Sequence, residues 1–150
     1  MIAYPDTSFL CAMYRNQVNS IEAARYFSQM PEPLYITSPL LFEFRQSIRW
    51  QAFLNTKDSS KGFHKTTAQA VLSKFHANIA SGAIVVLPVD WADVASIAEH
   101  LSAQYTWTKG YRGFDVIHVA TALHLGATEF LSFDEKQKEL AESEGLHVPL

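Results

Sequence analysis

Four acidic residues stand out in this sequence because of where they fall relative to short apolar segments. Asp6 and Asp134 each follow a predicted strand, Glu43 lies early in the helix that follows another, and Asp115 begins a predicted helix. If these strands belong to one open parallel sheet, their carboxyl ends share an edge, which is where ligands bind in such sheets. We therefore expect the four carboxylates to converge.

Carboxylates that converge need a counter-charge. Two of them about 4 Å apart repel by roughly 4 kcal/mol at an effective dielectric constant near 20. Hard divalent cations such as Mg²⁺ and Mn²⁺ take oxygen ligands and remove that repulsion. A pair of such ions, roughly 3.5–4 Å apart, can activate water and stabilise the leaving oxygen in phosphodiester hydrolysis. No Cys or His spacing in the sequence suggests zinc.

Each acid also has a simpler explanation. Asp6 and Asp134 could serve only as helix N-caps, for which Asp is favoured. Asp115 could be an acid placed favourably on a helix dipole. Glu43 is harder to explain, because it lies between apolar neighbours in Leu40-Leu41-Phe42-Glu43-Phe44. The placement of all four at one predicted edge favours a site.

Alternating strands and helices must position these acids. The predicted strands cover residues 2–4, 34–37, 83–89, 130–133 and 147–150. Helices are predicted from Asn19 or Ser20, from Ser38-Pro39, over an apolar stripe at 68–79 that Gly82 ends, after Asp90, from about Phe114 to Leu125, and from Asp134 to Gly145. Such alternation predicts an α/β three-layer sandwich (α/β/α) around a parallel sheet of about five strands.

The composition is that of one globular domain spanning residues 1–150. Its hydrophobic share of 48% is ample for a core, and its formal net charge of −3 means that nucleic acid would bind through a local patch or bound metal. The single cysteine, Cys11, excludes an internal disulfide, suits a reducing cytosol and is predicted to be a core residue. The N-terminus does not have the pattern of a signal peptide, and no apolar run is long enough for a membrane helix, so we expect a cytoplasmic protein.

Four segments carry a resemblance to a known family. They are Ala3-Tyr4-Pro5-Asp6-Thr7-Ser8-Phe9-Leu10, Ser38-Pro39-Leu40-Leu41-Phe42-Glu43-Phe44-Arg45, Phe114-Asp115-Val116-Ile117-His118-Val119-Ala120-Thr121-Ala122-Leu123 and Phe130-Leu131-Ser132-Phe133-Asp134. In this order they resemble the motifs of the PIN-domain family, and within it the VapC-type ribonuclease toxins of bacterial toxin–antitoxin pairs. One departure is Pro5, where the family more often has an aliphatic residue.

The resemblance implies a PIN-like fold and a metal-dependent endoribonuclease. The implied ligands and catalytic residues are Asp6, Glu43, Asp115 and Asp134, with Mg²⁺ or Mn²⁺ as cofactor and RNA as substrate. The implied partners are an antitoxin and a second copy of the chain. An aromatic content of 13%, with several aromatics in predicted loops, also favours the homodimer.

Residues near the acids form a second group of candidates. Thr7 and Ser8 could orient a ligand carboxylate or a metal-bound water, or could be local turn hydroxyls. His118 lies one turn after Asp115 and is more typical of a hydrogen-bonded histidine on a packed helix face than of a catalytic base. Arg112 could meet a phosphate or could be a solvated loop arginine.

Basic and aromatic residues give further candidates for RNA contacts. Lys109 and Arg112 alternate with Tyr105, Trp107 and Tyr111, a composition that suits base stacking and equally suits a core or subunit interface. The stretch from Phe44 to His76, which includes Arg45 and Arg49, has six cations and one acid. It could track an RNA backbone or could be an ordinary solvated pair of helices.

Two other functions compete with a nuclease. A non-catalytic scaffold of the same fold would be expected to lose the acids, and all four are present. A Rossmann-like phosphoryl-transfer or regulatory domain would pair the first-strand Asp with an Asp-x-Asp motif or with a lysine at a late strand end. The segment Asp6-Thr7-Ser8 has no second acid, and the last four residues contain no lysine.

Overall fold

The computed structural model describes residues 3–150 of the chain. Its four strands are β1 (Ala3–Pro5), β2 (Leu34–Thr37), β3 (Ile84–Leu87) and β4 (Glu129–Leu131). Its helices are α1 (Thr7–Tyr14), α2 (Ser20–Gln29), α3 (Ser38–Lys57), α4 (Lys65–Ala80), α5 (Trp91–Leu101), the π-helical turn η1 (Ser102–Thr106), α6 (Trp107–Lys109), α7 (Gly113–His124) and α8 (Glu135–Ser143). Residue 2 of the predicted strand 2–4 lies outside the described residues.

The described strands form two parallel pairs. β1 pairs with β4, with Tyr4 opposite Phe130, and β2 pairs with β3, with Ile36 opposite Val86. The pairs meet between β1 and β2, where the Tyr4 hydroxyl lies 2.8 Å from the Thr37 hydroxyl. Within each pair the strands are parallel, so β1 ends beside β4 and β2 ends beside β3. The hydrogen bond between Thr7 and Glu43 joins the segments that follow β1 and β2. The predicted α/β class with a parallel sheet is confirmed.

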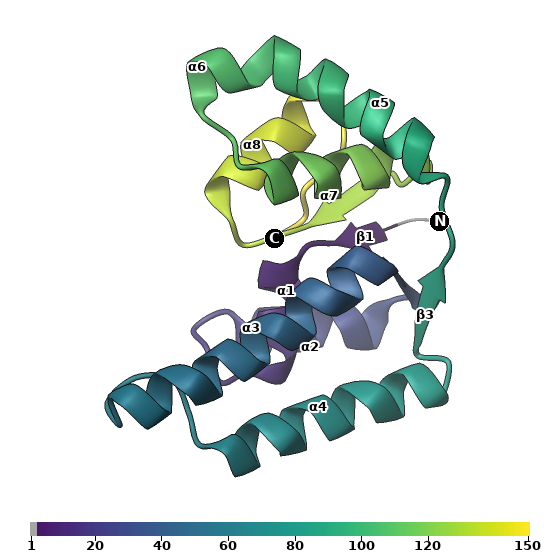
Figure 1. The fold of residues 1–150 in the computed structure, drawn as a ribbon. Helices are drawn as coiled ribbons and strands as arrows, with labels where there is room; N and C mark the ends of the chain where they lie inside the picture. Colours follow the sequence, from purple (N-terminus) through teal and green to yellow (C-terminus); the bar gives the residue numbers. More distant parts are fainter. Residues whose placement is uncertain (1–2) are drawn as a thin grey trace.

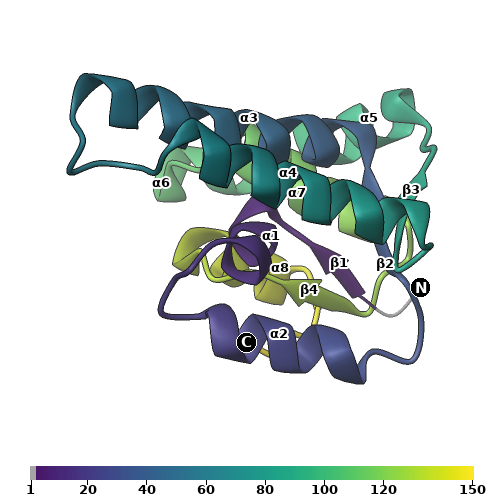
Figure 2. The same ribbon diagram turned by 90° about the horizontal axis from the view of Figure 1, so that it is seen from below.

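The helices cover both faces of the strands. Figure 1 shows α1 to α4 on one side and α5 to α8 on the other, and Figure 2 shows α3 and α4 running side by side. Rings from three helices fill the core on the first side: the centroids of Phe44 and Phe75 lie 4.6 Å apart, and that of Tyr14 lies 5.3 Å from Phe75. This contact fastens α3, which carries Glu43, to α1 and α4.

The predicted fifth strand at 147–150 is reduced to one bridge. His147 pairs in parallel with Glu129 through two backbone hydrogen bonds, from His147 N–H to Thr128 and from Phe130 N–H to His147. The next donor in that direction would be residue 149, which is a proline without an N–H. The ladder therefore stops after a single bridge.

Two helical segments are not predicted by the sequence patterns. α1 is apolar on nearly every side and buries Phe9, Leu10 and Cys11, so it lacks the polar stripe that would indicate a helix. The second segment is η1 with α6, which continues from α5 until Gly110 ends it in a left-handed conformation (φ 64°). The prediction that Cys11 is a free, buried core residue is confirmed.

No helix within residues 3–150 combines the length and the apolar character needed to cross a membrane.

Removing the buried ring of Phe44 should unfold the protein more easily. Phe44→Ala leaves a cavity beside Phe75, and we expect it to lower the free energy of unfolding by about 3–5 kcal/mol. The matched control is Phe42→Ala on the same helix, whose ring is 60% exposed and should cost far less. Chemical denaturation of both variants measures the difference, and equal losses would contradict the packing described above.

Candidate active site

The carboxylate of Asp6 is fully buried at the carboxyl end of β1. Its backbone N–H donates to Leu131 of β4, so Pro5 does not displace it from the strand end. Its Oδ1 accepts the Phe9 N–H at 2.9 Å, which caps α1. Asp6 is therefore both the N-cap of α1 and an acid at the end of a strand, as the two alternative predictions had it.

Two serine hydroxyls also donate hydrogen bonds to the Asp6 carboxylate. Ser8 Oγ donates at 2.7 Å to Oδ1, and Ser132 Oγ donates at 2.6 Å to Oδ2. The same hydroxyls accept backbone N–H groups from the segment after β4, from Phe133 to Ser8 and from Asp134 to Ser132. Burial raises the pKa of the Asp6 carboxyl, and these donors oppose the rise.

Glu43 is held by two side chains from other helices. Its Oε2 accepts hydrogen bonds from the Thr7 hydroxyl and from His118 Nε2, the latter at 2.6 Å. Partial burial would raise its pKa, but the hydrogen bonds from His118 and Thr7 outweigh that effect and lower it. Glu43 therefore stays ionised in a position shared by α1, α3 and α7.

The other two acids lie at helix starts: Asp115 is in the first turn of α7, and Asp134 directly precedes α8. Asp115 Oδ2 accepts the Arg112 N–H at 3.3 Å, and burial together with the negative charge of Asp134 raises the pKa of Asp115. Asp134 is exposed, and its Oδ1 accepts the Gln137 N–H at 3.0 Å, which caps α8. The effect of Asp134 on Asp115 places these two carboxylates in one electrostatic environment.

Hydrogen bonds and electrostatic effects link all four acids at this edge. His118 is hydrogen-bonded to Glu43, and a proton on its ring would oppose the rise that burial gives to the pKa values of Asp6 and Asp115. Ser132 joins Asp6 to the segment of Asp134. Within residues 3–150, no three His, Cys, Asp or Glu side chains are already grouped closely enough to hold a metal ion. Carboxylate oxygens are ligands that hard divalent cations such as Mg²⁺ and Mn²⁺ take.

The sequence matches the PIN domain over residues 3–143. The chain belongs to the PIN-domain family. Among solved structures, it is similar to VapC20 of Mycobacterium tuberculosis, described as a sarcin-ricin loop cleaving toxin, at 21% identity and a TM-score of 0.62 over 91% of this chain and 93% of that one.

Two other solved structures share the fold. FitAcB of Neisseria gonorrhoeae is 18% identical with a TM-score of 0.61, over 99% of this chain and 96% of that one. PAE2754 of Pyrobaculum aerophilum is 14% identical with a TM-score of 0.59, over 99% and 83% of the respective chains. No curated protein sequence matches the chain. At these identities the structures establish that the PIN domain shares their fold.

Two residues of this PIN domain that contact the acids were not nominated from the sequence. Ser132 lies in the quoted segment before Asp134, and its Ser-x-Asp spacing is the signal that could have indicated it. The sequence predicts His118 to be a hydrogen-bonded histidine on a packed helix face. It is indeed buried and hydrogen-bonded, but its partner is a candidate ligand, Glu43.

The basic and aromatic residues predicted to contact RNA differ in exposure and in their partners. Arg49 and Arg112 are exposed, Arg45 is half-buried, and the Lys109 ammonium pairs with Glu139. The hydroxyl of Tyr105 donates to Glu144, directly after α8, and that of Tyr111 donates to Glu139 of α8. Their polar ends are therefore tied to α8 and the residue after it, whereas Trp107 is 89% exposed.

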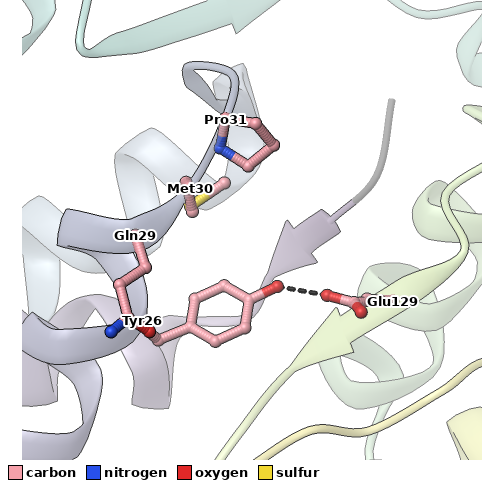
Figure 3. A pocket seen from close by; sticks show the side chains of 5 residues that line it. All are labelled: Tyr26, Gln29, Met30, Pro31 and Glu129. Carbon is pink, nitrogen blue, oxygen red and sulfur yellow. Dashed lines mark hydrogen bonds between the residues drawn. The ribbon is translucent and has the colours of Figure 1, made fainter.

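A cavity of about 350 Å³ lies at the opposite end of the strands. Figure 3 shows Tyr26 of α2 pointing across it toward Glu129 of β4, with which it forms a hydrogen bond. Glu129 pairs with Ala3, at the start of β1, whereas Asp6 follows the end of β1. This cavity is therefore separate from the acidic edge of the PIN domain.

The opposite pKa shifts of Asp6 and Glu43 predict opposite effects of removing their charges. The pKa of Asp6 is raised, so its ionisation destabilises the fold as pH rises through the folded pKa. The pKa of Glu43 is lowered, so its ionisation stabilises the fold above the unfolded pKa, and this is lost as pH falls through the folded pKa. In the presence of chelator at neutral pH, Asp6→Asn should raise the melting temperature and Glu43→Gln should lower it.

Both differences from the wild type should shrink toward zero as the solution is acidified below the unfolded pKa values of the two groups. Thermal unfolding over a pH series measures them. Shifts of the same sign at neutral pH would contradict the environments described for these carboxylates.

Proposed function

We propose that this PIN domain is a metal-dependent endoribonuclease whose site is formed by Asp6, Glu43, Asp115 and Asp134. The observation that supports the proposal is a set of hydrogen bonds around these acids: Ser132 bonds to Asp6 and to the Asp134 N–H, and Thr7, next to Asp6, bonds to Glu43. Asp115 and Asp134 also affect one another. Burial is the main cause of the raised pKa of Asp115, and the negative charge of Asp134 adds to it. A bound cation would stabilise such a cluster.

The residues that would hold Mg²⁺ or Mn²⁺ are these four carboxylates. When bound, such an ion supplies an activated water and neutralises charge on the phosphate. The chain's own contribution is orientation. Thr7 and His118 hold Glu43, while Ser8 and Ser132 hold Asp6, so that the carboxylates are restrained before any ion arrives.

The biological context that we propose is a bacterial toxin–antitoxin pair. Two structures of the same fold support it: VapC20 is described as a toxin that cleaves the sarcin-ricin loop, and FitAcB also belongs to this group of neighbours. We propose that the chain acts on RNA in the cytoplasm as a homodimer and that an antitoxin binds it. The exposed ring of Trp107 supplies apolar surface for a protein contact.

Asp115→Asn tests the proposed metal site. The change keeps the shape of the side chain and the hydrogen bond from Arg112 but removes a charge. Cleavage of single-stranded RNA with Mg²⁺ or Mn²⁺ should fall by orders of magnitude, because the ion supplies both nucleophile and charge stabilisation. Without metal, the melting temperature should stay the same or rise.

The matched control is Glu135→Gln, an exposed first-turn acid on α8 next to Asp134. It removes the same charge at the same edge and should leave cleavage nearly unchanged. Chelator should abolish wild-type cleavage, and added Mg²⁺ or Mn²⁺ should restore it. Undiminished cleavage by Asp115→Asn, or by the wild type in chelator, would refute the four-carboxylate site. A wild type that cleaves no RNA would favour the non-catalytic scaffold.

Expression of the wild-type chain in a bacterial host should arrest growth, because a toxin ribonuclease destroys essential RNA. Asp115→Asn should relieve the arrest at equal protein levels, and so should co-expression of the proposed antitoxin. The purified chain should have the mass of a dimer by light scattering at micromolar concentration. Undisturbed growth at high expression, together with a monomeric mass, would contradict the toxin assignment.

A further inference from the structure

One face of α3 carries an exposed stripe that begins at the acidic edge. Each member lies three or four residues from another, so they share one side of the helix. They are Phe42, Gln46, Arg49, Trp50, Phe53 and Lys57, all exposed. The stripe starts beside Glu43 and extends about 22 Å along the helix at 1.5 Å per residue. Figure 1 shows that α3 carries it away from β1 and β4 toward the turn into α4.

Large aromatic rings make up half of the stripe. Phe42, Trp50 and Phe53 are 60%, 51% and 46% exposed, although apolar rings of this size are usually covered. The Trp50 and Phe53 rings lie 5.2 Å apart with their planes inclined at 30°. The Lys57 ammonium lies 5.4 Å from the centre of the Phe53 ring. The stripe thus presents neighbouring ring surfaces with a cation beside them.

The charges beside these rings are positive. Arg49 and Lys57 belong to the stripe, and between Phe44 and Lys57 the helix has no acid. A groove of about 410 Å³ between α3 and α4 borders the stripe, with Phe53 and Leu72 among its apolar lining and Arg49 and Lys65 among its polar lining. Proteins that bind single-stranded nucleic acid combine aromatic rings, on which bases stack, with cations that contact the phosphates.

We propose that the α3 stripe is a track for single-stranded RNA that leads into the acidic edge. The proposal rests on the endoribonuclease function above and adds the surface that would hold the substrate. Unpaired bases would stack on Phe42, Trp50 and Phe53, while Arg49 and Lys57 would contact phosphates. A duplex hides its base faces, so the track selects unpaired RNA. Continuity with Glu43 and the positive charge both favour RNA over a second copy of this chain.

Binding is measured apart from cleavage, with the wild-type chain in chelator. The probe is a fluorescein-labelled single-stranded RNA of mixed sequence, followed by anisotropy, with its annealed duplex for comparison. We expect Trp50→Ala/Phe53→Ala to weaken binding of the single strand by at least about 10-fold, since stacking contributes about 1–3 kcal/mol per base. Trp50→Tyr/Phe53→Tyr should retain most of the affinity. The control Trp91→Ala, a 40% exposed ring on α5, should leave affinity unchanged.

The two cations give a second readout. Arg49→Gln and Lys57→Gln should each reduce the slope of log affinity against log salt by about 0.7, which is the value for one phosphate contact on a single strand. The control Lys74→Gln, an exposed cation on α4, should leave the slope unchanged. Melting temperatures within a few degrees of the wild type show that each variant is folded.

The outcomes separate this proposal from the nuclease function. RNA binding that depends on the stripe, without cleavage in Mg²⁺ or Mn²⁺, would support the track while the proposed nuclease fails. Cleavage by the wild type with unchanged binding in both the ring and the cation variants would overturn the track alone. If the ring variant instead changes the mass measured by light scattering and leaves RNA affinity intact, the stripe is an interface between copies and the proposal is wrong.

Discussion

The structure depends on keeping one carboxylate, that of Asp6, fully buried. A buried charge is costly unless hydrogen bonds replace the lost water. Here the Phe9 N–H and the hydroxyls of Ser8 and Ser132 supply them. Because these donors come from α1 and from the segment after β4, satisfying Asp6 also joins the first and last parts of the chain at one edge. The opposing effects of burial and hydrogen bonding decide its pKa.

A second arrangement, around Glu43, extends this edge to the other helices. Thr7 of α1 and His118 of α7 both bind its Oε2, so a glutamate on α3 connects elements on both faces of the strands. The aromatic contact of Phe44 with Phe75 fixes the same turn of α3. The position of Glu43 therefore depends on packing as well as on its hydrogen bonds. Restrained carboxylates of this kind suit the capture of a hard cation, since little side-chain freedom remains to be lost.

α3 combines two surfaces with different tasks. Its inner face, with Leu40, Phe44 and Ile48, is buried in the core. Its outer face carries rings and cations that are exposed. Keeping large rings exposed next to solvent is unfavourable for a folded monomer, and so this face is a natural place for a partner or substrate. The helix thereby links the core, the acidic edge and the proposed RNA surface in one rigid element.

Local patterns in the sequence determined the α/β class, the parallel strands and the positions of the four acids relative to strand and helix ends. Those features depend on periodicity, capping and turn residues, which act over a few positions. The end of the last strand could also have been predicted, because Pro149 has no N–H to donate. The helix α1 could not, since a helix buried on nearly all sides has no amphipathic period.

Only the tertiary structure decided which distant groups meet. His118 is 75 residues from Glu43, and Ser132 is 126 residues from Asp6, so no local pattern reports these hydrogen bonds. The same is true of Tyr105 and Tyr111, whose hydroxyls pair with acids in or directly after α8, and of Lys109, whose charge pairs with Glu139. The reason is physical: residue type states what a side chain can bind, but packing of the helices on the sheet decides which partner comes within hydrogen-bonding distance.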